Sequence, residues 1–121
     1  MDPVIGLARR GNHMYRIQDN SGPVRVVRTA WFASWLRGLR DARATAAVIV
    51  RIRRLEMGQA GDWKPLGGAM GELRIDVGPG YRVYVAALGP STVVLLGGGS
   101  KSTQSRDIAK ARAVLRSITS P

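Results

Sequence analysis

The sequence predicts one α+β domain in which helices pack on an antiparallel sheet. The chain of 121 residues is long enough for one hydrophobic core but too short for two. Its 45% hydrophobic and 22% charged residues are typical proportions for a folded globular protein. Along the chain, apolar residues recur first with helical spacing, then alternate as in strands, and finally return to helical spacing.

An irregular leader is predicted at residues 1–23, followed by a single domain at residues 24–121. The leader mixes Gly, Pro, Asn, Asp and Ser with few periodic apolar positions, as loose termini do. It lacks the continuous apolar segment of a secretory signal. No apolar run in the chain approaches the roughly 18 residues that a membrane span needs. We therefore expect a cytoplasmic protein with no membrane association.

A strand and a two-helix hairpin are predicted to open the domain. The β-branched run at residues 24–27 favours a strand, and Thr29 is expected to cap a first helix. The apolar stripe of that helix is Phe32, Trp35, Leu36 and Leu39. Its two aromatic members are interpreted as core rather than base-stacking residues, and either role stays open for Trp31 and Trp63. Asp41 is expected to cap a second helix, with the stripe Val48, Ile52 and Leu55.

Three antiparallel strands are predicted next, at residues 70–77, 81–87 and 92–96. No element is predicted at residues 58–68, because glycines and Pro65 break the pattern. In the first two strands an apolar face alternates with a basic and aromatic one. The third strand is apolar without alternation, which is typical of a central strand buried on both faces.

A glycine-rich loop at residues 97–101 and a last helix complete the prediction. Thr103 or Ser105 is expected to cap this helix. Its apolar stripe, opposite a basic one, is Ile108, Ala111, Leu115 and Ile118. The helices are expected to cover one face of the sheet, so that the other face stays open for function.

The charge of the chain predicts an anionic partner. Lys and Arg number 19 against 8 Asp and Glu, which makes the net charge +11. Sixteen of these basic residues are Arg, whose planar fork binds phosphate at two points. The chain has no Cys and a single His, His13, in the leader. This excludes disulfides, Cys-based zinc sites, thiol nucleophiles and Ser–His catalysis in the core, and no cofactor or metal is predicted.

The alternation of the strands places Arg74, Arg82 and Tyr84 on one face, where Lys101 arrives from the following loop. Cations aimed at a phosphate can stabilise the phosphorane that forms when RNA is cleaved by its own 2′-OH, and this needs no metal. Tyr84 is a candidate for stacking on a base or for proton transfer. The alternative interpretation is a half-buried tyrosine of the sheet.

Two carboxylates, Glu72 and Asp76, lie near this face and are candidates either for orienting the arginines or for the catalytic base. Additional RNA contacts are predicted at Arg51, Arg54, Lys64, Arg106 and Arg112. Each helical arginine, taken singly, can equally belong to a solvated helix face.

Five motifs in order resemble the RelE/ParE toxin superfamily, and in particular the HigB-type toxins of type II toxin–antitoxin modules. They are WLRGLRD at residues 35–41, GDWKPLG at 61–67, ELRI at 72–75, GPGYRVY at 78–84 and KSTQSRDI at 101–108. The resemblance covers about residues 29–118 and implies a RelE-like fold. It also implies a toxin that cleaves mRNA on the ribosome without a metal, leaves a cyclic phosphate end and inhibits translation and growth. A cognate antitoxin, expected to be a helix-turn-helix DNA-binding protein, would silence it.

The resemblance also assigns site residues. The Arg of the Tyr-Arg-Val-Tyr motif, which contacts the scissile phosphate in related toxins, is Arg82. Arg74 matches the basic position of the preceding strand, and Lys101 matches the loop lysine near the site. The branch usually has Gly-Gly-Asp-Lys where residues 98–101 read Gly-Gly-Ser-Lys, and a C-terminal tyrosine of some relatives is missing, so the proton-transfer group stays unassigned.

The superfamily also includes ParE-type toxins that act on DNA gyrase without cleaving RNA. A gyrase-directed toxin therefore remains an alternative prediction. So does a basic nucleic-acid-binding module with no toxicity.

Overall fold

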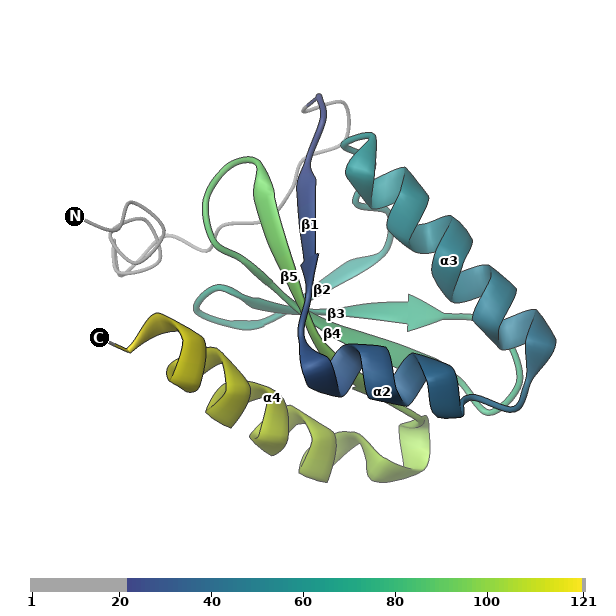
Figure 1. Cartoon of the computed structure of the whole chain (residues 1–121). Helices are drawn as coiled ribbons and strands as arrows, with labels where there is room; N and C mark the ends of the chain where they lie inside the picture. Colours follow the sequence, from purple (N-terminus) through teal and green to yellow (C-terminus); the bar gives the residue numbers. More distant parts are fainter. Residues whose placement is uncertain (1–21, 121) are drawn as a thin grey trace.

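The computed structural model describes residues 22–120, so nearly all of the predicted leader, His13 included, lies outside the described residues. The predicted α+β class is confirmed (Figure 1). The elements are β1 (Arg25–Arg28), α2 (Ala30–Gly38), α3 (Ala42–Glu56), β2 (Trp63–Gly67), β3 (Met70–Ile75), β4 (Tyr81–Ala87), β5 (Thr92–Gly99), the 3₁₀ turn η1 (Lys101–Thr103) and α4 (Gln104–Thr119). None of the helices in residues 22–120 is both long and apolar enough to span a bilayer.

The five strands form one sheet in the order β1-β5-β4-β3-β2. β1 pairs with β5 in parallel, and the other neighbouring pairs are antiparallel. β5 therefore lies inside the sheet, and all of its residues except Thr92 are buried. This confirms the prediction of an interior strand that is covered on both faces.

The structure corrects the prediction at two segments. Residues 58–68, where we expected no element, contain the strand β2, which pairs with β3 and carries an irregularity between Pro65 and Gly67. Proline is tolerated there because β2 is an edge strand, whose outward N–H needs no partner in the sheet. The expected glycine loop at residues 97–101 is instead the end of β5 followed by the start of η1.

The helix starts follow the predicted capping residues. The Thr29 hydroxyl accepts a hydrogen bond from the Phe32 amide at 3.2 Å. The Asp41 carboxylate accepts from the amides of Arg43 and Ala44, at 3.0 and 3.1 Å. Such bonds satisfy amides that have no partner within the first turn of a helix. At α4, Thr103 occupies the capping position without accepting a capping bond of this kind.

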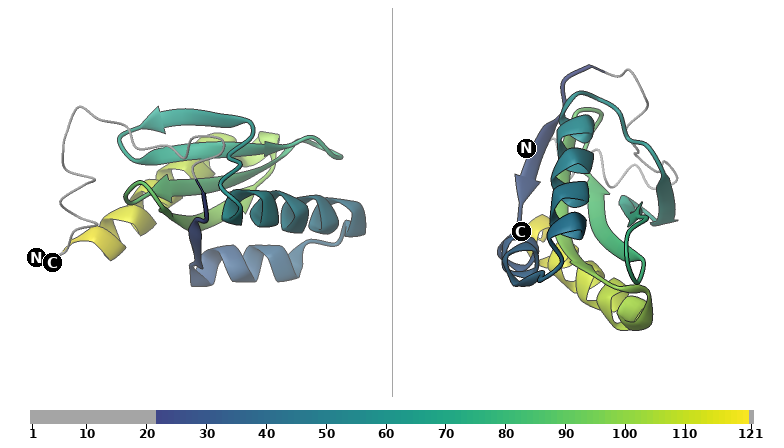
Figure 2. Two further views of the ribbon diagram at one scale, coloured as in Figure 1. Left: turned by 90° about the horizontal axis from the view of Figure 1, so that it is seen from above. Right: turned by 90° about the vertical axis from the view of Figure 1, so that its right-hand side faces the viewer.

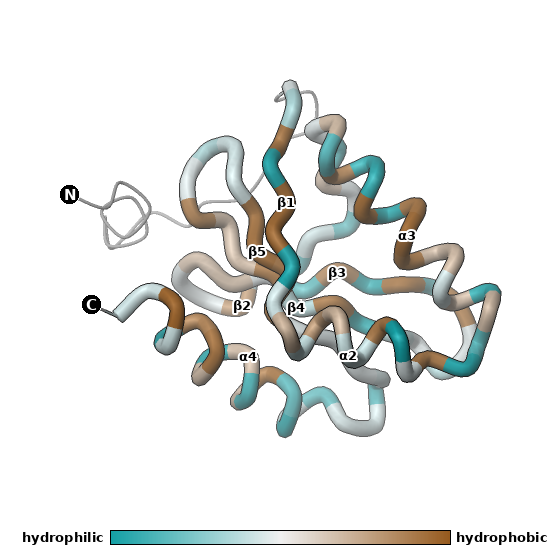
Figure 3. The backbone as a smooth tube through the Cα atoms, in the orientation of Figure 1, coloured by the Kyte–Doolittle hydropathy of each residue, from teal (hydrophilic) through white to brown (hydrophobic). Residues whose placement is uncertain are grey.

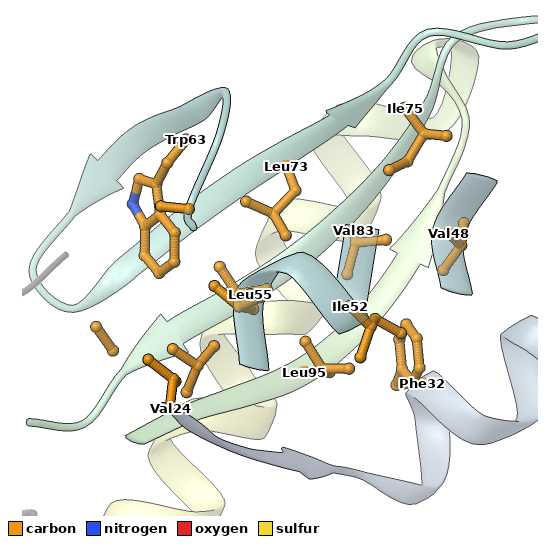
Figure 4. Close-up of a cluster of buried hydrophobic side chains, with 14 residues drawn as sticks. Val24, Phe32, Val48, Ile52, Leu55, Trp63, Leu73, Ile75, Val83 and Leu95 are labelled. Atoms are coloured by element: carbon orange, nitrogen blue, oxygen red, sulfur yellow. The ribbon is translucent and has the colours of Figure 1, made fainter. Parts of the chain in front are cut away.

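Helices cover both faces of the sheet, so the prediction of an open face is wrong (Figures 1 and 2). On one face, side chains of α2 and α3 pack against β3, β4 and β5 (Figure 4). This first core includes Phe32, Val48, Ile52, Leu55, Leu73, Val83 and Leu95. On the other face α4 packs on a second core that includes Met70, Tyr84, Leu96 and Ala111.

The reason for this arrangement is that α4 has its own apolar stripe to bury. Hydrophobic and hydrophilic residues alternate along α3 and α4 (Figure 3). With one face of the sheet already occupied by α2 and α3, the stripe of α4 packs on the other. Helical periodicity in a sequence reveals the stripe but not the face of the sheet that it covers.

The three glycines at the end of β5 leave room for side chains from two helices. A Cβ at Gly97 would overlap the Trp31 ring, and one at Gly98 would overlap the Trp35 ring. A Cβ at Gly99 would overlap the Asp107 carboxylate. The glycines thus allow α2 and α4 to pack directly on the backbone of the sheet.

We expect Gly97→Ala to lower the free energy of unfolding by about 1 to 3 kcal/mol, because the added methyl overpacks a close contact between Trp31 and the backbone. Urea unfolding measures the change. Gly38→Ala is the matched control, since a Cβ there meets no atom within 4 Å. Equal stabilities for the two variants would contradict the packing of Trp31 on Gly97.

Candidate active site

The buried carboxylate of Glu72 lies at the centre of a polar cluster in the sheet. The residue is 0% exposed. Its Oε2 lies 3.4 Å from Nε of Arg74 and 3.6 Å from Nε of Arg82. Its Oε1 accepts a hydrogen bond of 2.7 Å from the Gln104 side chain of α4. Because an isolated buried carboxylate is very costly, these partners are what allow the charge to lie in the core.

Strand register explains why these residues meet. Arg74 of β3 is directly opposite Arg82 of β4, and Glu72 is directly opposite Tyr84. Residues two apart in a strand share a face, so all four side chains lie on the face that α4 covers. Two arginines in opposing positions repel each other, and the shared carboxylate offsets that repulsion.

Arg82 and Lys101 both lie beside Gly80, in the turn between β3 and β4. The Arg82 side chain is 10% exposed, and its Nη1 donates to the Gly80 carbonyl at 2.6 Å. Its Nε is buried without a hydrogen-bond partner. The Cβ of Lys101 lies 3.9 Å from the position that a Cβ on Gly80 would occupy. Arg74 and Arg82 therefore meet at Glu72, and Lys101 lies beside the adjoining Gly80 turn, so its convergence with the two arginines stays a prediction.

A hollow of about 340 Å³ opens at this end of the sheet. The residues that line it include Arg82, Tyr81 and Arg74, whose side chain is 49% exposed. Asp62 and Asp76, both exposed, also line the hollow. The hollow is thus lined by two arginines, which can donate hydrogen bonds to an anion, and by two aspartates, which can accept a proton.

The role predicted for Tyr84 does not fit its position. The residue is 0% exposed and its hydroxyl has no hydrogen-bond partner, so its ring has no free surface on which a base could stack. Burial raises the pKa of Tyr84 to about 12, with contributions in the same direction from Glu72 and Asp107 and an opposing one from Arg82. A phenol with this pKa is a poor proton acceptor near neutral pH. The alternative of a tyrosine packed in the sheet is confirmed, with deeper burial than expected.

Of the two carboxylates considered from the sequence, Glu72 has the geometry of a residue that orients the arginines, and Asp76 lies free in the hollow. Sequence reasoning missed Gln104 and Asp62. Gln104 reaches Glu72 only because α4 covers this face, and no local pattern indicates that. Asp62 directly precedes β2, the strand that the glycine pattern concealed.

Two of the predicted RNA-binding arginines donate hydrogen bonds to backbone carbonyl groups of the protein. Arg51 donates to the carbonyls of Arg74, Ala60 and Asp62, at 2.8, 3.1 and 2.8 Å. Burial lowers the pKa of Arg51 from its ordinary value, Arg54 adds to the lowering and Asp62 opposes it. Arg112 donates to the Leu66 carbonyl at 2.5 Å. Both arginines therefore join elements of the fold, and their contact with RNA stays a prediction.

The other three predicted RNA-binding residues are exposed near the cluster. Lys64 of β2 lies opposite Glu72 in the sheet. Arg54 lines a separate hollow of about 530 Å³ between α3 and β3, to which Arg74 also contributes. Arg106 lines a third hollow beside α2 and α4. Trp63 is buried in the first core. Within residues 22–120, His, Asp and Glu side chains form no group of three or more that could hold a metal ion.

Comparison with known proteins finds a relative by sequence and neighbours by structure. No family model matches the chain. An uncharacterized protein of Haemophilus influenzae is 42% identical over 95 residues, which are 78% of this chain and 96% of that protein. The chain belongs to the same family as this Haemophilus protein.

One structural neighbour is a chain in the crystal structure of the toxin–antitoxin complex RelBE2 from Mycobacterium tuberculosis. The two share a TM-score of 0.54 and 22% sequence identity, over 70% of this chain and 99% of the neighbour. The fold is therefore RelE-like, as the resemblance implied.

We expect Arg51→Ala to lower the free energy of unfolding by about 1 to 3 kcal/mol, because three carbonyls lose a charged donor. Arg54→Ala, three residues away on the same helix, removes an exposed side chain and should change stability by less than about 0.5 kcal/mol. Thermal or urea unfolding of both variants tests this pair. Equal destabilisation by the two variants would show that the hydrogen bonds of Arg51 add nothing to stability.

We expect Tyr84→Phe to keep the fold and to leave stability at pH 7 unchanged or raised by about 1 kcal/mol, because the lost hydroxyl has no partner. At alkaline pH the stability of Tyr84→Phe should differ from that of the parent protein. The phenol ionises in the unfolded chain near its ordinary pKa of 10.0 but in the folded chain only near 12, so its contribution to stability is lost as the pH rises through this window. Urea unfolding between about pH 9 and pH 12 should show a smaller loss in Tyr84→Phe than in the parent. An identical pH dependence would contradict the raised pKa.

Proposed function

We propose that this protein is the toxin of a type II toxin–antitoxin pair, of the HigB type, and that it cleaves mRNA on the ribosome. The observation that carries the proposal is the cluster in which Glu72 holds Arg74 and Arg82 at the edge of a hollow. Lys101 lies beside Gly80, which lines the same hollow. The RelE-like fold and the five sequence motifs support the same conclusion.

In the proposed reaction the 2′-oxygen of a ribose attacks the adjacent phosphorus, the bond from phosphorus to the 5′-oxygen breaks, and a cyclic phosphate remains. Arg74 and Arg82 bind the phosphate and stabilise the charge that develops on the phosphorane. Buried pairing with Glu72 holds the two guanidinium groups in place before the substrate arrives. No metal has a part in these steps.

Two proton transfers complete the reaction. Asp76 is our candidate for the group that takes the proton of the 2′-OH, because it is an exposed carboxylate in the same hollow. Lys101, an exposed lysine beside the Gly80 turn that lines the hollow, is our candidate for protonating the 5′-oxygen. Tyr84 takes no part, because it is buried and its pKa is raised.

The proposed partners are a cognate antitoxin and the translating ribosome in the cytoplasm. The structural neighbour comes from a complex of a toxin with its antitoxin. A net charge of +11 favours both RNA and an acidic protein surface, and steers either one toward the site. We expect the antitoxin to be a helix-turn-helix DNA-binding protein.

The decisive experiment adds the purified protein to a bacterial cell-free translation reaction and maps the 5′ ends of the mRNA. We expect new ends only on translated message. Arg82→Lys keeps a charge beside the buried Glu72 but loses the planar fork, and should lower the cleavage rate by about 10²- to 10³-fold. Arg74→Ala should also lower it.

Arg116→Ala is the matched control, because Arg116 is an exposed arginine in the last turn of α4. It should cleave at the parental rate. Intact message with the parent protein would contradict the proposal, and inhibition of DNA supercoiling by gyrase would then favour the alternative target. An unchanged cleavage rate in Arg82→Lys would contradict the assignment of the site.

A further inference from the structure

A groove of about 560 Å³ lies between α2, the end of β5 and the first turns of α4, next to the candidate active site. One side of it is aromatic and the other is basic. The lining side chains include Trp31, Trp35, Tyr81, Arg106, Asp107 and Lys110. None of these residues has a role in the reaction described above.

The aromatic rings of the groove are held in place by the sheet. Trp31 and Trp35 occupy the space above Gly97 and Gly98, where any side chain on β5 would collide with them. Trp35 also packs edge-on against Tyr81, with 6.4 Å between ring centroids. Rings that are fixed before binding lose little conformational entropy when a ligand stacks on them.

Cations line the opposite side of the groove. The Nζ of Lys110 lies 4.4 Å from the centre of the Trp31 ring, a cation–π contact at an exposed site. Arg106 is exposed about one turn earlier on the same helix. The Asp107 carboxylate accepts a hydrogen bond from the Thr103 hydroxyl and lies in the first turn of α4, where the helix dipole favours negative charge. The side chains free to meet a ligand on this side are therefore cationic.

Tyr81 connects the groove to the active site, because it lines both this groove and the hollow that contains Arg74 and Arg82. A chain whose phosphate lies on the two arginines can continue past Tyr81 into the groove. Fixed aromatic rings next to mobile cations are the combination that binds single-stranded nucleic acid, with bases on the rings and phosphates on the cations.

We propose that this groove binds one nucleotide of single-stranded RNA next to the bond that is cleaved. The base stacks in the aromatic side and displaces the Lys110 ammonium from Trp31, and Lys110 and Arg106 then pair with the flanking phosphate. The inference rests on the proposed function, because it takes RNA as the substrate.

Direct binding tests the groove without any cleavage. The probe is a six-nucleotide 2′-O-methyl RNA, which has no 2′-OH to attack, titrated into the full chain while tryptophan fluorescence is recorded. Stacking on the groove should quench the emission, whereas Trp63, buried in the first core, supplies a constant background. The double variant Arg106→Glu with Lys110→Glu should bind at least about tenfold more weakly.

The matched control is the double variant Arg53→Glu with Arg116→Glu, which changes the charge equally, because both arginines are exposed on helices and lie outside the groove. The salt dependence of RNA binding is compared between the variants to correct for total charge. After this correction the control should retain the parental affinity for the RNA. Equal weakening in the control and the groove variant would overturn the proposal. A hexaglutamate peptide that binds as tightly as the RNA, with the same quenching, would also overturn it and would favour an acidic protein as occupant.

The translation assay separates this inference from the proposed function. If the parent cleaves mRNA, the groove variant should cleave at least about tenfold more slowly or at different sites, and unchanged cleavage would overturn the groove while leaving the function intact. If the parent does not cleave but the RNA probe binds and the groove variant loses that binding, the groove is supported and the proposed reaction is wrong.

Discussion

The buried charge of Glu72 is the constraint on which the candidate site depends. A carboxylate with no exposed surface must be paired, and its partners come from three elements: β3, β4 and α4. Meeting that requirement holds Arg74 and Arg82 beside each other despite their like charge. The same pairing that makes the buried carboxylate tolerable thus orients the two groups that we assign to the phosphate.

Covering the second face of the sheet gives α4 a structural part in the same site. Its apolar stripe forms the second core, which encloses Tyr84, and its first residue supplies the amide that hydrogen-bonds to Glu72. The basic residues on the other side of its first turns line the groove that we propose for a nucleotide. The packing of one helix therefore determines which polar groups are buried and which remain available to a ligand.

Local patterns in the sequence predicted most of the elements for simple physical reasons. Side chains alternate in a strand and recur every three to four residues in a helix, and Thr29 and Asp41 can satisfy free amides only at a helix start. The sequence does not predict the strand β2, because its glycines and Pro65 indicate turns. An edge strand tolerates these residues with little loss of stability. The glycines at the end of β5 predict a loop, but they are there to make room for Trp31, Trp35 and Asp107, which are distant in sequence.

The sequence alone determined the fold class, the charge, the shared face of Arg74 and Arg82, and the absence of cysteine and of histidine from residues 22–120. All of these follow from composition or from the periodicity of helices and of two neighbouring strands. Only the tertiary structure decided that α4 covers that face. Burial and hydrogen bonding depend on what packs above a residue, and this decided that Tyr84 is enclosed, that Glu72 is the partner of the arginines and that Arg51 binds carbonyls. The periodicity of a sequence predicts the face of a helix or strand on which a side chain lies, but only the tertiary packing determines which groups contact it.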